Sequence, residues 1–247
     1  MKSSDMKLSQ IELDCSKAER EGQLMAYAKE LGVAFMGIAQ AEMFVEAPSG
    51  FHPEDLLPGA KSVIVTGRPF LKATISTERV EPYTLVRNHL SRQMDQASIE
   101  LCYKIETLYH EDAVPVGAVA PCSWDSNTGR SRGAISLKHA AQLAGLGRIG
   151  KNTLLIHPEF GNMVWLGGVV TTAEFHHHIR PLMREMCPEE CRICIDACPV
   201  GALESQFDQR KCWDWAFKNT NTEEFRIVCR SCRSSCPQAH GKRSDNQ

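Results

Sequence analysis

The chain has 247 residues, of which 43% are hydrophobic and 23% charged, and its formal net charge is −2. These values are ordinary for a globular protein with a proper core, and the charge gives no electrostatic reason to expect a nucleic-acid partner. No apolar run approaches the ~20 residues of a membrane-spanning helix. The N-terminus has neither a signal-peptide core nor a twin arginine. We therefore expect a cytoplasmic protein without a membrane contact.

The first 180 residues alternate between helical and strand patterns. Apolar residues three to four apart predict helices, and short apolar runs predict buried strands. In chain order we expect a helix at 17–31, strands at 33–39 and 61–67, a helix at 82–110, a strand at 113–120, a helix at 136–147 and a strand at 163–172. Gly167 and Gly168 in the last strand indicate a bulge or a close backbone approach. The alternation predicts an α/β or α+β fold.

The pattern divides the chain into four parts. Residues 1–16 form a polar arm, and residues 17–180 form an α/β domain. Residues 181–238 form a cysteine-rich domain, and residues 239–247 form a polar tail that we expect to be disordered.

The sequence AGLGRIGKNTLLIHPEFG, residues 144–161, lies between the last predicted helix and strand. Its glycines, with Lys151, Asn152 and Thr153, predict a polar loop whose backbone can approach a ligand closely. It matches neither the Walker A motif nor the dinucleotide-binding fingerprint. Taken alone, a glycine-rich turn is favoured over a ligand contact.

Eight of the eleven cysteines fall between residues 187 and 236. In a long chain without a secretion signal, such a cluster indicates metal binding rather than disulfides. The segment contains an internal repeat, because C-x2-C-x3-C-P occurs twice. The first half of the repeat holds Cys187, Cys191, Cys194 and Cys198, and the second half holds Cys212, Cys229, Cys232 and Cys236.

The spacing predicts two [4Fe–4S] clusters, because in two-cluster ferredoxins the fourth cysteine of each run binds the other cluster. One cluster is then held by Cys187, Cys191, Cys194 and Cys236, and the other by Cys198, Cys212, Cys229 and Cys232. Structural zinc is the alternative, but it does not need the repeated C-x3-C-P ending. The weakest ligand is Cys187, because three residues separate it from Cys191 where two are usual. Three aromatic residues follow Cys212 closely: Trp213, Trp215 and Phe217. We expect them to pack in the core, and the alternative is that they shield a cluster from water.

The glycine-rich loop, the strand after it and the double cysteine motif together resemble the epoxyqueuosine reductase family, which is related to corrinoid reductive dehalogenases. The resemblance is most specific over residues 136–237 and more diffuse over 20–120, where HPEDLLPGAKSVIV is similar to the family's N-terminal region. It implies a nitroreductase-like, cobalamin-binding α+β domain followed by a bacterial-type ferredoxin domain with two [4Fe–4S] clusters. In such enzymes electrons pass through the clusters to cobalt.

The resemblance also implies residue roles. The eight cysteines match the family's cluster ligands. The residues implied beside the cofactor are Gly147, Arg148, Gly150, Lys151, Asn152, Thr153 and His157. For His157 a structural role in a turn is the favoured alternative. The triplet 176–178, three histidines, is more typical of a solvated connector than of an axial cobalt ligand. We expect Cys122 to be a buried apolar thiol rather than a cofactor contact.

Two departures from the family pattern affect the expected activity. No Asp or Glu occurs between Asp125 and Glu159, where the family has an acidic proton donor; Lys138 or His139 are alternatives, and no catalytic residue is assigned. The sequence also ends soon after Cys236, where epoxyqueuosine reductases continue into a helical-repeat segment that holds tRNA. With the net charge, this leads us to expect no tRNA partner.

The leading hypothesis is an iron–sulfur oxidoreductase that passes low-potential electrons, from a ferredoxin- or flavodoxin-type donor, through two clusters to cobalamin. The product is then a reduced small molecule or the reduced corrinoid of a partner protein. One alternative is a non-enzymatic electron-transfer protein, or one that binds a corrinoid or another tetrapyrrole. A flavin in the nitroreductase-like pocket is a third interpretation.

Overall fold

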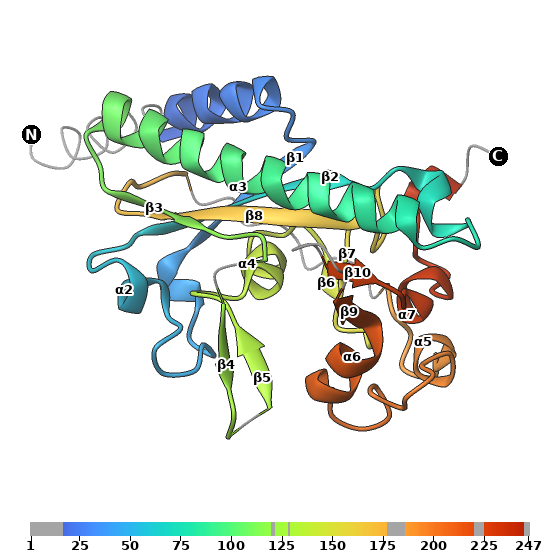
Figure 1. The fold of residues 1–247 in the computed structure, drawn as a ribbon. Helices are drawn as coiled ribbons and strands as arrows, with labels where there is room; N and C mark the ends of the chain where they lie inside the picture. The colour runs from blue at the N-terminus through green and yellow to red at the C-terminus, as the bar shows by residue number, and fades with distance from the viewer. Residues whose placement is uncertain (1–16, 120–121, 128, 177–185, 220–224, 245–247) are drawn as a thin grey trace, which may run out of the picture.

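The structure, a computed structural model, describes residues 17–119, 122–127, 129–176, 186–219 and 225–244 (Figure 1). Residues 17–30 are helical. They are followed by β1 (Phe35–Gln40), η1 (Ala41–Met43), α2 (Pro53–Leu56), β2 (Ser62–Pro69), η2 (Lys72–Ile75), α3 (Glu81–Tyr109), β3 (Ala113–Val116), β4 (Ser123–Asp125), β5 (Arg130–Arg132), α4 (Leu137–Leu143), β6 (Arg148–Ile149), β7 (Leu155–Ile156) and β8 (Val164–Thr171). The cysteine-rich part contains α5 (Ile193–Asp196), α6 (Gln209–Ala216), β9 (Phe217–Asn219), β10 (Phe225–Ile227), α7 (Ser231–Ser234) and η3 (Gly241–Ser244).

A four-stranded sheet with the order β1-β2-β8-β3 forms the centre of the fold, and every neighbouring pair is antiparallel. The α3 helix and the helix at 17–30 cover one face, and α4 covers the other (Figure 1). An antiparallel sheet with helices on its faces is an α+β fold, so the predicted α+β class is confirmed, while the ferredoxin-type domain stays a prediction. In the part of the chain that the structure describes, no helix is both long and apolar enough to cross a membrane.

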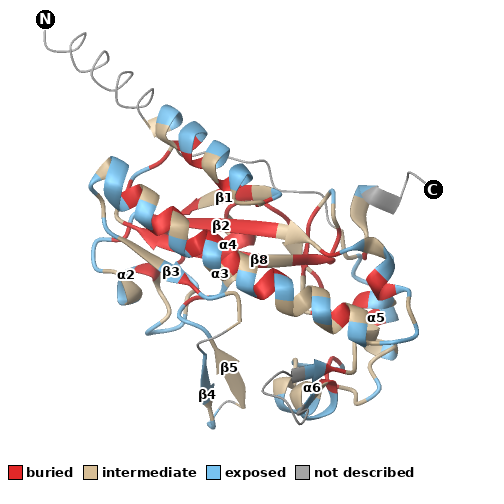
Figure 2. Ribbon diagram, turned by 45° about the horizontal axis from the view of Figure 1, so that its top comes forward, coloured by how far each residue is buried: buried red, intermediate tan, exposed pale blue. Residues whose placement is uncertain are grey.

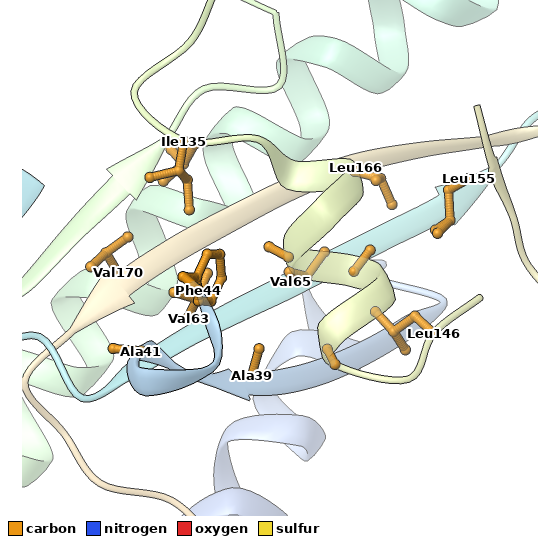
Figure 3. Close-up of a cluster of buried hydrophobic side chains, with 14 of the residues drawn as sticks. Ala39, Ala41, Phe44, Val63, Val65, Ile135, Leu146, Leu155, Leu166 and Val170 are labelled. Carbon is orange, nitrogen blue, oxygen red and sulfur yellow. The ribbon is translucent and has the colours of Figure 1, made fainter. Parts of the chain in front are cut away.

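The sheet is buried on both faces because its two central strands carry apolar residues at consecutive positions. Val63 and Val65 of β2 point into the layer under α4, and Ile64 between them points into the layer under α3. Figure 3 shows the α4 layer, where Val65 lies among side chains from β1, β8 and the loop after α4. The colouring in Figure 2 shows the same division, with the middle strands buried and the outer side of α3 exposed.

The long helix α3 forms where the apolar spacing predicted it. Pro82 stands in its first turn, where the missing N–H costs nothing, and Met94, Leu101 and Ile105 are fully buried against the sheet. The helix ends at His110, which takes the left-handed conformation that ends a helix even though it is not glycine (φ 54°). The apolar face of α3 therefore fixes this helix along the whole length of the sheet.

Several predicted boundaries differ from the structure. The predicted strand at 113–120 ends at Val116, because the backbone then turns so that the Ala118 N–H donates to Asp95 Oδ1 (2.7 Å). The sequence FHPEDLLPGA, read as a loop, contains α2, whose first turn is capped by His52 and Asp55. The bulge expected at Gly167 and Gly168 is absent, since both keep regular register with β2.

The close backbone approach predicted for Gly167 is present. A Cβ atom at this position would stand 2.9 Å from the Met94 carbonyl oxygen and from Ser98 Oγ, both on α3. Glycine therefore sets how closely α3 lies on β8. Part of the predicted C-terminal tail is also packed, since Ala239 is buried and the Lys242 N–H donates to the Pro158 carbonyl (3.1 Å).

We predict that Gly167→Val lowers the free energy of unfolding by about 1–3 kcal/mol, because the added methyl groups overpack the contact between α3 and β8. Gly22→Ala is the control, since nothing lies within 4 Å of a Cβ at this exposed helical position. It should raise the free energy of unfolding by up to about 1 kcal/mol. Urea denaturation followed by circular dichroism measures both changes. Equal stability of Gly167→Val and the unchanged protein would contradict the close-packing interpretation.

Candidate functional site

The cysteine-rich part repeats one local structure. The α5 and α7 helices are single turns that pack against each other, and each contains the second cysteine of a C-x2-C pair, Cys194 or Cys232. The residue before each helix has nearly the same backbone conformation, with φ −121° and ψ 2° at Arg192 and φ −139° and ψ 17° at Arg230. The internal repeat of the sequence is therefore also a repeat of structure.

The eight cysteines of this part gather into two sets of four. The first set is Cys187, Cys191, Cys194 and Cys236, in which Cys194 interacts electrostatically with the other three. The second set is Cys198, Cys212, Cys229 and Cys232, in which Cys232 interacts with the other three. Each set takes one cysteine from the opposite half of the repeat. This is the grouping that the ferredoxin rule predicts, while the role of the cysteines as cluster ligands stays a prediction.

The chemistry of both sets suits iron–sulfur clusters. Burial raises the pKa of Cys232 to about 12, and burial followed by the neighbouring thiols raises the pKa of Cys194 and Cys212. Thiols in such surroundings stay protonated unless a bound cation compensates their charge. Hydrogen-bond donors already face the sulfurs: the Ala202 N–H donates to Cys198 Sγ (3.3 Å), and the side chain of Asn162 hydrogen-bonds Cys236.

A single metal ion places its ligands closer together than a cubane does. Among the described residues no three Cys, His, Asp or Glu side chains form a group able to hold one metal ion. The four cysteines of a cubane bind four different irons, so their sulfurs stand further apart than the ligands of one ion. Which metal group the two all-thiol sets hold stays a prediction.

The glycine-rich loop folds into a small hairpin in which β6 pairs with β7. Gly147 is required because a Cβ there would stand 2.3 Å from the Ile156 carbonyl oxygen. Thr153 has a positive φ of 60°, and its carbonyl accepts a hydrogen bond from Lys138 Nζ (2.6 Å). These contacts fix the conformation of the loop and the direction of the side chains at its tip.

Two side chains at this tip contact the cysteine-rich part. Lys151 Nζ donates to the backbone carbonyls of Pro188 (3.0 Å), Glu189 and Cys191 (2.9 Å). Asn152 is buried, and its Nδ2 donates to the Cys232 carbonyl (3.2 Å). The loop therefore touches both cysteine sets through their backbones.

The other predicted loop residues make local contacts. The buried His157 ring stacks on the Phe160 ring (5.0 Å between centroids) and lies tilted against the Phe35 ring (4.4 Å). Its Nδ1 accepts from the Glu159 N–H (3.1 Å). Arg148 is half-buried and forms no ion pair with a described residue. Protein contacts thus account for Lys151, Asn152 and His157 without a ligand, and a cofactor role for the loop stays a prediction.

Two arginines anchor the second cysteine set, and neither was singled out from the sequence. Arg233 is buried, lies over the Phe70 ring (5.1 Å) and donates to the Asn162 carbonyl. Arg230 donates to the carbonyls of Ile75 (3.3 Å) and Thr77. For Arg230 the signal was the recurrence of arginine after the first cysteine of each C-x2-C pair, at positions 192 and 230, and this recurrence does not mark Arg233.

The remaining predicted residues are spread over the fold. Lys138 is half-buried, and burial followed by the charge of Arg233 lowers its pKa. Burial followed by the charge of Lys138 lowers the pKa of His139, whose Nδ1 lies 2.7 Å from Ser136 Oγ. The expectation of a buried Cys122 is wrong, since this thiol is exposed just before β4, in a hairpin outside the central sheet.

The aromatic residues after Cys212 have different environments. Trp213 stacks on Phe217 (4.5 Å), and Phe217 packs against the buried cluster around Phe70. Trp215 is 47% exposed. Core packing therefore explains Phe217 and does not explain Trp215.

One hollow of about 540 Å³ lies at the end of the sheet where β1 ends and β2 begins, and Gln40, Lys61, Glu174 and His176 are among its lining residues. It contains no residue of the glycine-rich loop and no cysteine. Of the three histidines at 176–178 only His176 is described, and the other two lie outside the described residues. The polar hollow is thus separate from the candidate site.

The similarities to known proteins agree with the predicted resemblance, although no protein-family model matches the chain. Epoxyqueuosine reductase of Bacillus cereus is 28% identical over 88% of this chain, and that of Bacillus subtilis is 26% identical over 89%. The chain spans 64% of the length of both relatives. The resemblance to epoxyqueuosine reductases is therefore confirmed.

Solved structures show the same fold. Epoxyqueuosine reductase from Streptococcus thermophilus aligns with 89% of this chain and 66% of its own, with a TM-score of 0.60 and 21% identity. A catabolic reductive dehalogenase aligns with 91% of this chain and 32% of its own, with a TM-score of 0.61 and 15% identity. The likeness covers most of the described chain.

A further solved structure overturns one expectation. It is an epoxyqueuosine reductase with an epoxyqueuosine-modified tRNA-Tyr stem loop, and it aligns with 90% of this chain and 65% of its own at a TM-score of 0.60 and 21% identity. The expectation that tRNA is not a partner is therefore wrong. The expectation rested first on the net charge, which averages over the whole chain. It rested secondly on where the given sequence ends, which does not decide whether tRNA binds.

We predict that Arg233→Met destabilises the protein by about 1–3 kcal/mol, because it leaves the buried Asn162 carbonyl without its donor. Arg192→Met is the matched control, since Arg192 is exposed and its ion pair within the described residues is with Asp196 (3.5 Å). Its effect should stay within about 0.5 kcal/mol. Urea denaturation of anaerobically purified protein measures both. A change for Arg233→Met no larger than that of the control would contradict the anchoring role.

Proposed function

We propose, on the premise of this similarity to epoxyqueuosine reductases, that the protein is an iron–sulfur reductase that acts on a modified nucleoside of tRNA. The observation that supports it most is the pair of four-thiol sets, held against the sheet by the glycine-rich loop and by Arg230 and Arg233. The substrate class comes from the names of the relatives. Since the chain spans 64% of their length, activity on tRNA is part of the proposal.

In this proposal the cysteine sets form the electron path. Each set binds one [4Fe–4S] cluster and therefore carries one electron at a time. Cys194 and Cys198 belong to different sets but are four residues apart, and Cys232 and Cys236 repeat the arrangement. Two short stretches of backbone thus join the clusters, which keeps them close enough for direct transfer.

Cobalamin is included by the resemblance, and when bound it supplies a cobalt centre that the clusters can reduce. Within the loop, Arg148 is the side chain that we propose to face it, since the contacts of Lys151 and Asn152 are with protein. In this proposal the protein's own residues hold the clusters, fix the position of the glycine-rich loop and exclude water from the buried thiols. The protein is proposed to act in the cytoplasm.

A second candidate function is electron transfer without catalysis. The absence of Asp and Glu between Asp125 and Glu159 favours it, because the resemblance implies an acidic proton donor in that stretch. Lys138 is the group there whose lowered pKa would make it a stronger acid than a free lysine. Turnover of a modified tRNA separates the two functions.

We predict that Cys194→Ser and Cys212→Ser each remove one cluster, so that iron falls from about eight to about four per chain. Cys102→Ala is the control, because Cys102 is buried in α3 and belongs to neither set. Iron and sulfide analysis after anaerobic reconstitution measures the content. A content near one metal ion per set, or zinc in place of iron, would contradict the cluster proposal.

We predict that the reconstituted protein, with cobalamin and a low-potential reductant, converts an epoxyqueuosine-containing tRNA stem loop into its deoxygenated product. Nucleoside mass spectrometry measures the product, and the Cys212→Ser variant serves as the control because it lacks the complete electron path. Full reduction of both clusters and cobalamin without any loss of the epoxide would favour the electron-transfer function instead.

A further inference from the structure

We propose that Lys151 is a positioning residue that aims three backbone N–H groups at the first cysteine set and thereby raises the reduction potential of the cluster held there. The inference rests on the proposed function, since it requires a cluster at that set. It concerns the segment with the unusual three-residue gap, residues 187–191.

The contacts of Lys151 are with backbone only. Its ammonium group has three N–H donors, and it donates to three carbonyls, those of Pro188, Glu189 and Cys191. The exposed carboxylates of Glu189 and Glu190 form no ion pair with it. A cation that satisfies three carbonyls of one short segment fixes the orientation of the peptide units in that segment.

The orientation of these carbonyls also fixes the direction of the N–H groups in the same peptide units. In a trans peptide the C=O of one residue and the N–H of the next point in opposite directions. Because the three carbonyls point at Lys151, the N–H groups of Glu189, Glu190 and Arg192 point away from it. Glu189 and Glu190 lie between Cys187 and Cys191, and Arg192 lies between Cys191 and Cys194, so these N–H groups belong to the short stretches of backbone that join the cysteines of the first set.

The hydrogen-bond pattern leaves these three donors available. None of the N–H groups of Glu189, Glu190 and Arg192 donates to any residue that the structure describes. A sulfur of each set already accepts hydrogen bonds from other groups, Cys198 from the Ala202 N–H and Cys236 from the backbone of Gln238 and the side chain of Asn162. Hydrogen bonds from N–H groups to the sulfurs of a cluster are one of the factors that set its reduction potential.

The direction of the effect follows from charge. Reduction adds one negative charge to a cluster that is already anionic with its four thiolates. N–H donors aimed at the sulfurs and a nearby ammonium both stabilise this added charge. Loss of Lys151 therefore lowers the potential of the first cluster. It also removes the hydrogen bonds that hold the carbonyls of this segment. The backbone between Cys187 and Cys191, which is one residue longer than the usual spacing between these cysteines, can then change its conformation.

The test uses the anaerobically reconstituted full chain and a redox titration followed by electron paramagnetic resonance. We expect Lys151→Met to change the ratio of oxidised to reduced first cluster by about tenfold, which is about 59 mV for a one-electron couple. The second cluster should shift less. The first cluster is identified as the signal that disappears in Cys194→Ser.

Two control variants separate positioning from general destabilisation. Lys151→Arg keeps the charge and several donors, and it should restore most of the potential. Lys218→Met removes a lysine of the same part of the chain that donates to a single carbonyl, that of Asp214 (2.7 Å), and it should leave both potentials unchanged. Loss of only the first cluster in Lys151→Met, with its retention in Lys151→Arg, also supports the proposal.

Full iron content with unchanged potentials in Lys151→Met overturns the inference, and so does equal loss of both clusters. These outcomes leave the proposed function standing as long as the unchanged protein holds two clusters. If the unchanged protein holds none, the proposed function fails together with the inference. Iron and sulfide analysis of the unchanged protein therefore decides which of the two has failed.

Discussion

The contact between cationic or amide side chains and backbone carbonyls, at the junction of the sheet and the cysteine-rich part, is the interaction on which the candidate site depends. Lys151 and Asn152 reach from the glycine-rich loop to carbonyls beside the cysteines. Arg230 and Arg233 reach in the opposite direction, to carbonyls of the sheet domain. A loop that binds a cluster has few side chains of its own to pack, so its backbone must be held from outside. Charged donors do this well because their hydrogen bonds are stronger than neutral ones.

A small apolar cluster supports the same junction. Phe70, Tyr83 and Met163 of the sheet domain pack with Ile227 and Ala239 of the cysteine-rich part, and the backbone N–H of Ile227 donates to the hydroxyl of Thr84 at the start of α3 (3.2 Å). The cysteine-rich part is thus fixed to α3 and the sheet. Electron transfer between fixed centres needs such a scaffold, since a small change of distance changes the rate.

The failure of the expectation about tRNA has a physical reason. A net charge of −2 averages over 247 residues and says nothing of where the charges lie. Between Asp125 and Glu159 there are five Lys and Arg residues and no Asp or Glu. Among the described residues none of these five takes part in an ion pair. A weakly acidic chain can therefore present a cationic stretch, and total charge was the wrong quantity on which to judge a partner.

The sequence by itself determined the main elements and the grouping of the cysteines. Apolar periodicity placed α3 and the strands of the central sheet to within a few residues, because burial on the two faces of a sheet dictates that periodicity. Spacing alone placed Cys236 with the first set and Cys198 with the second. The tertiary structure decided what the glycine-rich loop contacts, that Arg233 is buried and that Cys122 is exposed. These features arise between segments far apart in the chain, and no local pattern records which backbone carbonyl a lysine or an arginine will meet after folding.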